Sequence, residues 1–516
     1  MVLKEVGGAP RPLFVFEEVS TMTQDDQQVE MLEPEEESEK VLRMGTAPIG
    51  RLLFEFGIPA IAATVLSALY NIIDSIFLGH AMGEVGLAAT TVAAPIMTIM
   101  MAIAVVAGAG GNALGAILLG EGRHARAEQT LGNTMFLMIA FAIPIAIVAT
   151  FFIDPLLILV GATDVTLPYA RVFVQIISYG FILNNIAYGV SNFMRTAGAP
   201  WQALGVSALG TVVCIALNWL FVLQWGWGVA GSALATILGQ GASSVWVLWY
   251  FVLNKKAPFH LRGRYLKPEG KLCLKICALG MAPFALQAAA SITQVAGNAV
   301  MATLGSADVI GTDGALASIG VVMKVVMFAV FPASGIAIAA QPVLGFNLGA
   351  RKYTRVKRTL FDAIAAAFVI LLIFFILIHV IPEAIIGLFG VEPHLMEFSV
   401  IGLQIMTILM PITALQMIGS NYFQATGQPM KSTILSLTRQ LIYLLPAYFI
   451  VPAVLPVLFP QLTPLLSFCF AFPVADLLSV VTCLIFLIIE VRRLNGLIRQ
   501  ESGRQSNQEE VNHVGV

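Results

Sequence analysis

The sequence has very little charge. Asp, Glu, Lys and Arg make up 11% of its 516 residues, hydrophobic residues make up 58%, and the mean hydropathy is +0.87. A soluble domain carries about 25% charged residues. The shortage of charge therefore excludes an ordinary soluble protein and predicts a protein that is embedded in lipid.

The chain also lacks the residue groupings that are typical of membrane enzymes and disulfide-stabilised proteins. Its five cysteines lie in apolar runs, with neither a disulfide framework nor paired CxxC spacing, so we interpret them as packing residues. Its six histidines are dispersed and form no HExxH or similar group. These absences argue against an enzyme, and we expect no cofactor and no nucleic-acid partner.

The first 45 residues do not contain a signal peptide, because no basic segment is followed by an apolar one. Five glutamates cluster between Glu33 and Glu39. Low hydrophobicity and dense like charge predict a disordered, acidic cytoplasmic tail over residues 1–50.

Long apolar runs with short loops between them fill the chain from Arg51 onward. A helix needs about 20 apolar residues to cross a bilayer. The runs therefore predict an all-α integral membrane protein with twelve transmembrane helices, over residues 52–79, 87–119, 130–153, 165–192, 197–224, 228–253, 272–304, 314–346, 359–381, 395–423, 430–452 and 466–490.

The positions of Lys and Arg predict the orientation. All but three of the 28 fall in the terminal segments or in alternate loops on one side, and the loops on the other side contain none. Positive charge accumulates on the cytoplasmic side of membranes, so we expect both termini to be cytoplasmic. The exceptions, which lie within spans, are Arg171, Lys324 and Arg439.

The chain repeats itself with a constant offset of 229 residues. Glycines, prolines and loop cations all match, among them Leu119, Gly120, Arg123 and Arg126 with Leu348, Gly349, Lys352 and Arg355. Six spans separate the copies, so the two halves are parallel repeats related by an axis along the membrane normal. We predict an N-lobe over 51–254, a basic cytoplasmic linker over 255–271, a C-lobe over 272–490, a C-terminal cytoplasmic tail over 491–516, and a central cleft between the lobes.

One carboxylate, Asp74, lies inside the first span. Helical spacing places Tyr70 and Asn71 on the same stripe as Asp74. An acid in the membrane either forms a structural hydrogen bond with a neighbouring helix or faces a transport path, where it takes up a proton or a cation. We favour the second interpretation.

The C-lobe carries three further charges within its spans, Lys324, Arg439 and Asp476. Arg439 and Asp476 lie on consecutive spans and favour a structural ion pair, because buried charges need partners. For Lys324 three roles stay open: repelling cations, binding an anionic group of a substrate, or pairing with Asp476.

Several motifs together resemble the MATE (multidrug and toxic compound extrusion) transporters over about residues 50–495, and most resemble the bacterial DinF-like and MepA-like branch. They are the stretches 70–79, 110–120, 192–198, 228–236, 341–350 and 423–429, in order and at the family's spacing.

The resemblance implies secondary active efflux, in which H+ or Na+ moving inward drives amphipathic, often cationic organic compounds outward by alternating access. It implies ion-coupling residues at Asp74, Asn192, Asn218 and Thr236, which are also the candidate Na+ ligands. The candidate substrate-cavity residues are Tyr70, Asn71, Lys324 and Gln341. Here Val222 replaces an acid that relatives often carry four residues after the Asn218 position. Because Na+ requires several oxygen ligands, this difference favours H+.

We expect a monomer in the bacterial cytoplasmic (inner) membrane, with the lipid bilayer and small organic molecules as its partners. A lipid-linked oligosaccharide flippase of the same superfamily is the alternative function. Such proteins usually have more spans and several cavity arginines.

Overall fold

The computed structural model describes the backbone of residues 39–159, 162, 164–253, 260–261, 263–389 and 393–514. Within these ranges some side chains are also outside the description, including those of residues 68–76 and 501–514. Of the tail that the sequence predicted to be disordered, residues 1–38 lie outside the described residues. The prediction is wrong for the rest of the tail, because residues 39–46 form a helix and Met44 is fully buried.

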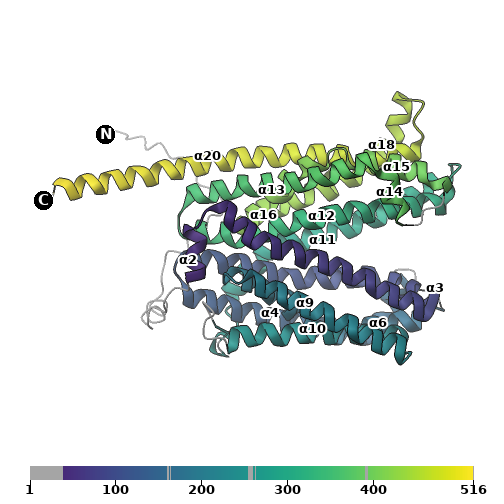
Figure 1. The fold of residues 1–516 in the computed structure, drawn as a ribbon, viewed down its shortest axis with the longest axis horizontal. Helices are drawn as coiled ribbons and strands as arrows, with labels where there is room; N and C mark the ends of the chain where they lie inside the picture. The colour runs from purple at the N-terminus through teal and green to yellow at the C-terminus, as the bar shows by residue number, and fades with distance from the viewer. Residues whose placement is uncertain are drawn as a thin grey trace, which may run out of the picture. The chain divides into compact units, whose positions relative to one another are not determined.

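The described chain is helical and contains no strand (Figure 1). Its first half comprises α2 (Glu39–Thr46), α3 (Ile49–Gly120), α4 (His124–Phe151), α5 (Ile153–Leu159), α6 (Leu167–Tyr179), α7 (Phe181–Asn185), η2 (Ile186–Val190), α8 (Ser191–Thr196), α9 (Pro200–Asn218), η3 (Trp219–Gln224) and α10 (Gly228–Val252). The short helix η4 (Gly263–Leu266) lies in the linker.

The second half comprises α11 (Gly270–Gly305), α12 (Gly311–Gly349), α13 (Tyr353–Val380), α14 (Pro382–Gly387), α15 (Pro393–Thr407), η5 (Met410–Ile412), α16 (Thr413–Ala425), α17 (Pro429–Leu437), η6 (Thr438–Leu444), α18 (Leu445–Leu458), α19 (Pro464–Cys469) and α20 (Ala471–Val514). In Figure 1 the helices α13, α15, α16, α18 and α20 lie above α4, α6, α9 and α10. The N-lobe and the C-lobe are thus separate layers of helices.

The twelve predicted spans all correspond to described helices. Ten stretches are long and apolar enough to cross a membrane, and the bent pair Leu167–Tyr179 and Phe181–Thr196 makes an eleventh among the described residues. The remaining predicted span, 228–253, is α10. Its glycines, its serines and Gln240 lower its hydropathy, yet its length of 25 residues is enough to span a bilayer.

Helix α3 contains the first two spans, Ile49–Ser67 and Val92–Gly120. In the first, the Thr64 hydroxyl donates to the Phe331 carbonyl over 3.2 Å; in the second, the Asn112 amide donates to Gln341 over 3.1 Å. A straight helix would separate residues 64 and 112 by about 70 Å, but their partners in α12 are only about 15 Å apart along that helix. The two spans of α3 therefore run in opposite directions.

The sequence predicts a loop at residues 80–86, but in the structure the backbone stays helical there. Ala81, Met82 and Glu84 are strong helix formers, and no proline lies between Pro59 and Pro95 to end the helix. The chain thus reverses between residues 67 and 92 while keeping helical hydrogen bonding, which suits a segment close to lipid.

The second span of α3 crosses α12 at equivalent residues of the two repeats. A Cβ atom on Gly120 would overlap the Phe346 carbonyl, and one on Gly349 would overlap the Ile117 carbonyl. Ile117 and Phe346 are 229 residues apart, as are Gly120 and Gly349. Such reciprocal contacts are the signature of a two-fold axis. The parallel repeat predicted from the sequence is therefore confirmed, and its axis passes between α3 and α12.

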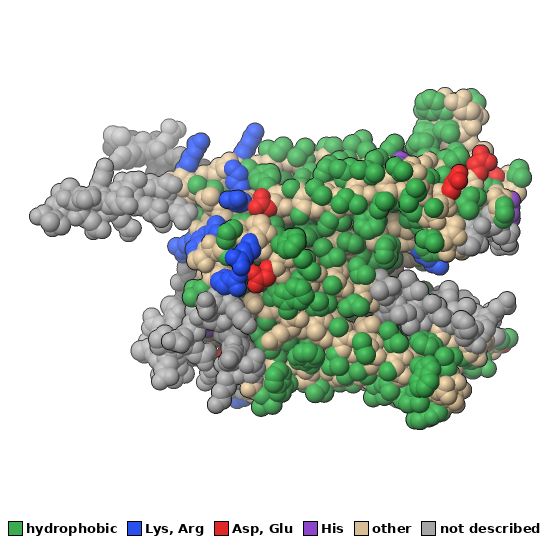
Figure 2. All heavy atoms as spheres, viewed as in Figure 1, with side chains coloured by type: hydrophobic (Ala, Val, Ile, Leu, Met, Phe, Trp, Pro, Cys, Tyr) green, Lys and Arg blue, Asp and Glu red, His purple; other side chains and the backbone are tan. Residues whose placement is uncertain are grey.

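Small residues make this crossing possible. Ala116 and Gly120 in α3, and Gly345 and Gly349 in α12, form matching small-xxx-small motifs, which let helix backbones approach closely in membranes. The crossing lies where both helices end. Many of the cations gather at the same end, which we call the basic end and define by Arg123, Lys275, Arg351, Lys352 and Arg355. Figure 2 shows Lys and Arg side chains gathered there, at the left, and hydrophobic side chains over the middle.

A methyl group at Gly349 should disrupt the crossing, whereas Gly320 of the same helix has open space around it. We expect Gly349→Ala to cost about 1–3 kcal/mol through overpacking. Gly320→Ala should be neutral or stabilise the helix by up to about 1 kcal/mol. Thermal unfolding of the detergent-solubilised variants measures this difference. Equal unfolding temperatures for the two would contradict the crossing.

Candidate functional site

The stripe of Tyr70, Asn71 and Asp74 lies on the backbone of α3, but its side chains are outside the described residues. The roles assigned to these three residues stay predictions. The polar residues that were expected to accompany them come from α8, α9, α10 and α12, and these are described.

The structure brings two of the predicted ion-coupling residues together. The Asn218 amide, at the end of α9, donates to the Cys214 sulfur over 3.5 Å, and the Cys214 thiol lies 3.9 Å from the Thr236 hydroxyl of α10. Asn218 is only 1% exposed, and its Oδ1 has no hydrogen-bond donor among the described residues. A buried carbonyl oxygen without a donor can accept one from a protonated acid.

A π-helical segment, η3, starts directly after Asn218. A π-bulge widens the helix, leaves backbone groups less regularly bonded, and occurs frequently at functional sites. The equivalent C-lobe helix also contains such a segment, η6, and Arg439 lies in it. Both lobes therefore carry an irregular turn beside a residue that the sequence singled out.

Asn192 is placed differently from Asn218 and Thr236. Its Oδ1 accepts a hydrogen bond from Arg195, one turn later in α8. No described contact joins Asn192 to Asn218 or Thr236. In the described geometry Asn192 orients a buried arginine, and its role in ion coupling stays a prediction.

Asn185 is a buried polar residue that the sequence analysis missed. It is 1% exposed, neither its Nδ2 nor its Oδ1 has a partner among the described residues, and the π-helix η2 begins at the next residue. An unpaired buried amide is costly, so Asn185 is a further candidate site residue of the N-lobe. The available signal was the pair Asn184-Asn185 inside an apolar span.

Gln341 lies at the contact between the lobes. Its Oε1 accepts from Asn112, its equivalent in the other repeat, and the Thr196 hydroxyl donates to Asn112 Oδ1 over 2.5 Å. The Nε2 of Gln341 has no acceptor among the described residues. In this conformation Gln341 therefore belongs to a buried polar bridge on the two-fold axis.

Lys324 is exposed and lies in α12, eleven residues before Gly335, which contacts Ile61 of α3. Lys324 is about 16 Å farther from the basic end than Gly335. Among the described side chains it pairs with neither Asp476 nor any other acid.

Arg439 and Asp476 form the ion pair that the sequence favoured. The Arg439 Nε lies 2.6 Å from Asp476 Oδ1, and the Asp476 side chain is nearly buried. The pair joins η6 to α20 inside the C-lobe.

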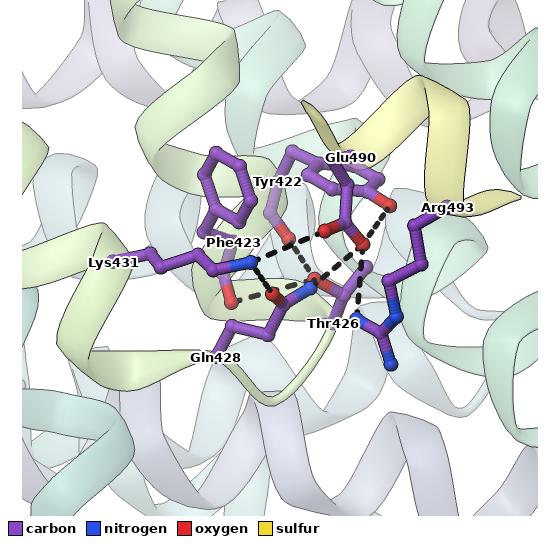
Figure 3. A network of polar contacts seen from close by, with 7 residues as sticks. All are labelled: Tyr422, Phe423, Thr426, Gln428, Lys431, Glu490 and Arg493. Carbon is purple, nitrogen blue, oxygen red and sulfur yellow. Dashed lines mark hydrogen bonds and ion pairs between the residues drawn. The ribbon is translucent and has the colours of Figure 1, made fainter. Parts of the chain in front are cut away.

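A second buried carboxylate of the C-lobe, Glu490 of α20, was missed by the sequence analysis. It is 2% exposed and lies at the centre of the network in Figure 3. Lys431 and Arg493 each approach it to 3.3 Å, and Gln428 donates to it over 2.9 Å. The network fastens the turn between α16 and α17 to α20 at the basic end. The signal was an acid followed by Arg492 and Arg493 at the end of an apolar span.

Among the described residues, no group of three or more His, Cys, Asp or Glu side chains could hold a metal ion. The predicted Na+ ligands other than Asp74 supply amide and hydroxyl oxygens, and a thiol lies between two of them. Such a set is incomplete without the carboxylate.

Comparisons with known proteins fit this architecture. The MatE family model matches residues 59–220 and 280–449, more than half of the chain. The multidrug export protein MepA of Staphylococcus aureus (strain MRSA252) is 22% identical over 413 residues, which cover 79% of this chain and 88% of that protein. MepA of Staphylococcus haemolyticus (strain JCSC1435) is 22% identical over 418 residues, which cover 80% and 89%.

Solved structures of MATE transporters have a similar fold. The MATE multidrug transporter DinF-BH, solved in complex with a ligand, is 31% identical, with a TM-score of 0.79 over 88% of this chain and 98% of that one. An outward-facing multidrug resistance MATE family transporter of the MOP superfamily has the same fold, with 21% identity and a TM-score of 0.81 over 90% and 100%. This chain is therefore a multi-pass membrane protein of the MatE family, with twelve transmembrane helices in two parallel six-helix repeats.

Proposed function

We propose that this protein exports small amphipathic, often cationic organic molecules by alternating access, driven by H+ moving inward. The observation that carries the proposal is the reciprocal contact of the two repeats at the basic end, because a carrier needs two lobes that meet at one end and can part there. Membership of the MatE family supports it, as do relatives named as multidrug export proteins and a related multidrug transporter solved with a bound ligand.

The contacts between the lobes support a conformation that is open on the side away from the basic end. Described contacts run from the Gly120–Gly349 crossing to the hydrogen bond between Thr64 and Phe331. Beyond this level Lys324 is exposed. We assign the basic end to the cytoplasm of a bacterial cell by the positive-inside rule, which makes both termini cytoplasmic and this conformation outward-facing.

H+ fits the described N-lobe residues better than Na+. Hard cations require several oxygen ligands, but the space between Asn218 and Thr236 contains the Cys214 thiol. Val222, one turn after Asn218, is apolar and buried, so it supplies no second carboxylate. Asp74 would then be the proton carrier, with no cofactor required.

The coupling follows from the two charge states of Asp74. As a carboxylate it holds a cationic compound by charge-assisted hydrogen bonding in the dehydrated cleft. Once protonated, it loses that attraction, so the compound is released. Both lobes and the cleft come from one chain, so we expect the monomer to carry out the cycle.

The first test is efflux of ethidium, a fluorescent amphipathic cation, from vesicles that contain the purified protein, with a pH gradient and a Na+ gradient imposed separately. We expect the pH gradient to drive efflux and the Na+ gradient to have little effect. Asp74→Asn should abolish gradient-driven efflux, because the amide can neither carry a proton nor pair with a cation.

The matched control is Asp154→Asn, which removes a carboxylate at the far end of the N-lobe, where Asp154 pairs with Arg171. It should keep the parent's efflux. The proposal of H+ coupling fails if Asp74→Asn transports like the parent, or if only the Na+ gradient drives export.

We assign a structural role to the pair of Arg439 and Asp476. Asp476→Asn leaves the partly buried Arg439 without its partner at a buried position and should destabilise the protein by about 3 kcal/mol. Asp154→Asn, which breaks a half-exposed pair of the same length, should cost about 1 kcal/mol or less. Thermal unfolding in detergent compares the two. The double variant Arg439→Gln, Asp476→Asn should keep at least half of the parent's efflux, and complete loss in a folded double variant would instead indicate a role in coupling.

A further inference from the structure

We infer that Arg126 and Arg355 are the paired positioning residues of a cytoplasmic gate, in which each lobe holds the segment that leads into the first helix of the other lobe. The inference rests on the proposed alternating-access function and deepens it. It concerns groups outside the predicted coupling site, all at the basic end.

The first half of the gate is on the C-lobe. The Arg355 Nη2, near the start of α13, donates to the carbonyls of Met44 over 3.1 Å and Ala47 over 2.6 Å. Lys352 Nζ donates to the Gly45 carbonyl over 2.9 Å, and Asn347 Nδ2 to Met44 over 3.0 Å. These carbonyls lie at or just after the C-terminal end of α2. Carbonyls at a helix C-terminus have no hydrogen-bond donor within the helix, and the helix dipole favours cations there.

Only Ala47 and Pro48 separate α2 from α3, the first helix of the N-lobe. Whatever holds α2 therefore holds the start of the N-lobe. Met44 is fully buried, which indicates that α2 is docked and does not merely touch the C-lobe. The C-lobe thus binds the segment that leads into the first helix of the N-lobe.

The second half of the gate is on the N-lobe. Arg126 Nη1, near the start of α4, forms an ion pair of 3.0 Å with Glu269, and Gln129 donates to the same carboxylate oxygen over 2.8 Å. Asn133 Oδ1 accepts from the Glu269 backbone N–H over 2.8 Å. Glu269 is the residue directly before α11, the first helix of the C-lobe. The N-lobe therefore binds the segment that leads into the first helix of the C-lobe.

The two halves are the same device in the two repeats. Arg126 and Arg355 are 229 residues apart, the offset of the repeat. Each lies at the start of the third helix of its lobe, and each bonds to the segment before the first helix of the opposite lobe. A random pair of surface cations would not be expected to follow both the offset and the exchange.

The third component of the gate lies at the axis. Glu121 follows Gly120 at the crossing and pairs with Arg123 over 3.2 Å. Burial raises the pKa of Glu121, while Arg123, together with Arg351 and Lys275 of the C-lobe, acts to lower it. Charges of both lobes thus meet at the centre, between the two arginine contacts.

These contacts are of the strength that a reversible gate needs. An ion pair between half-exposed side chains contributes about 1 kcal/mol or less, so transport can break it without a large barrier. The two arginine contacts each join opposite lobes, and the charges around Glu121 come from both lobes, so in the proposed gate opening toward the cytoplasm separates all three parts. None of them has to change while the outer side opens or closes.

The test uses Gln341→Cys as a reporter, because Gln341 is buried on the axis behind the gate and its replacement is smaller. The five native cysteines are replaced by Ala or Ser, and a membrane-impermeant maleimide is added from the cytoplasmic or the outer side of vesicles, with no substrate or gradient. Cytoplasmic labelling then measures how often the gate is open, and labelling from outside measures general loosening.

We expect Arg126→Gln to raise the cytoplasmic labelling rate by about two- to fivefold, the range for loss of a half-exposed ion pair. Arg355→Gln should raise it by about tenfold, because it removes several charge-assisted hydrogen bonds. The exchanged pair Arg126→Glu, Glu269→Arg should return the rate to within about twofold of the parent. Labelling from outside should stay at the parent's rate.

The matched control is Arg171→Gln, which breaks the 2.6 Å pair with Asp154 inside the N-lobe at the opposite end. It should not change cytoplasmic labelling. Parental rates for both Arg126→Gln and Arg355→Gln would overturn the gate, as would an equal increase in Arg171→Gln or failure of the exchanged pair to restore protection. Because labelling needs neither substrate nor ion gradient, this result is independent of whether the parent exports ethidium.

Discussion

The close crossing of α3 and α12 on the two-fold axis is the constraint on which the rest of the structure depends. Without side chains at Gly120 and Gly349, each backbone can contact a carbonyl of the other helix, and the equivalence of the two sites makes the contact reciprocal. Lipid provides no hydrophobic force to press two helices together, so close packing of small residues has to do this. The crossing fixes the axis and brings Asn112 to Gln341, and the two arginine contacts lie at the same end of the molecule.

The two lobes bury different polar and charged groups. The N-lobe holds polar groups without partners, Asn185 and the oxygen of Asn218, beside π-helical turns. The C-lobe also holds unpaired polar atoms among the described residues, such as Asn421 Oδ1 and Gln424 Nε2, but its two buried carboxylates are compensated, Asp476 by Arg439 and Glu490 by two cations and an amide. Compensated buried charges are stable, which is consistent with a structural role for the C-lobe carboxylates.

Much of the fold could be predicted from the sequence because apolar length, loop charge and the 229-residue repeat act over whole helices. The helical reversal of α3 could not, since residues 80–86 combine loop-like glycines with helix formers and only contacts with α12 decide between them. Glu490, at the end of a span, and Asn185, inside one, were missed because the sequence around a single polar residue looks the same whether its side chain is paired, unpaired, buried or exposed. The contacts of Arg126 with Glu269 and of Arg355 with the Met44 carbonyl join segments that are distant in the sequence, and local patterns do not reveal such contacts. Asp74 was singled out by the cost of burying an acid, which is a local property.

The central claim is that the contact on the axis opens and closes once in each transport cycle. Cysteines at Asn112 and Gln341, joined by a short reducible cross-linker in an otherwise cysteine-free protein, test it directly, because their parent side chains are 3.1 Å apart across the lobes. The account predicts that cross-linking stops gradient-driven efflux and that reduction restores it, while either single cysteine treated in the same way still transports. Full-rate efflux by the cross-linked protein would contradict the account.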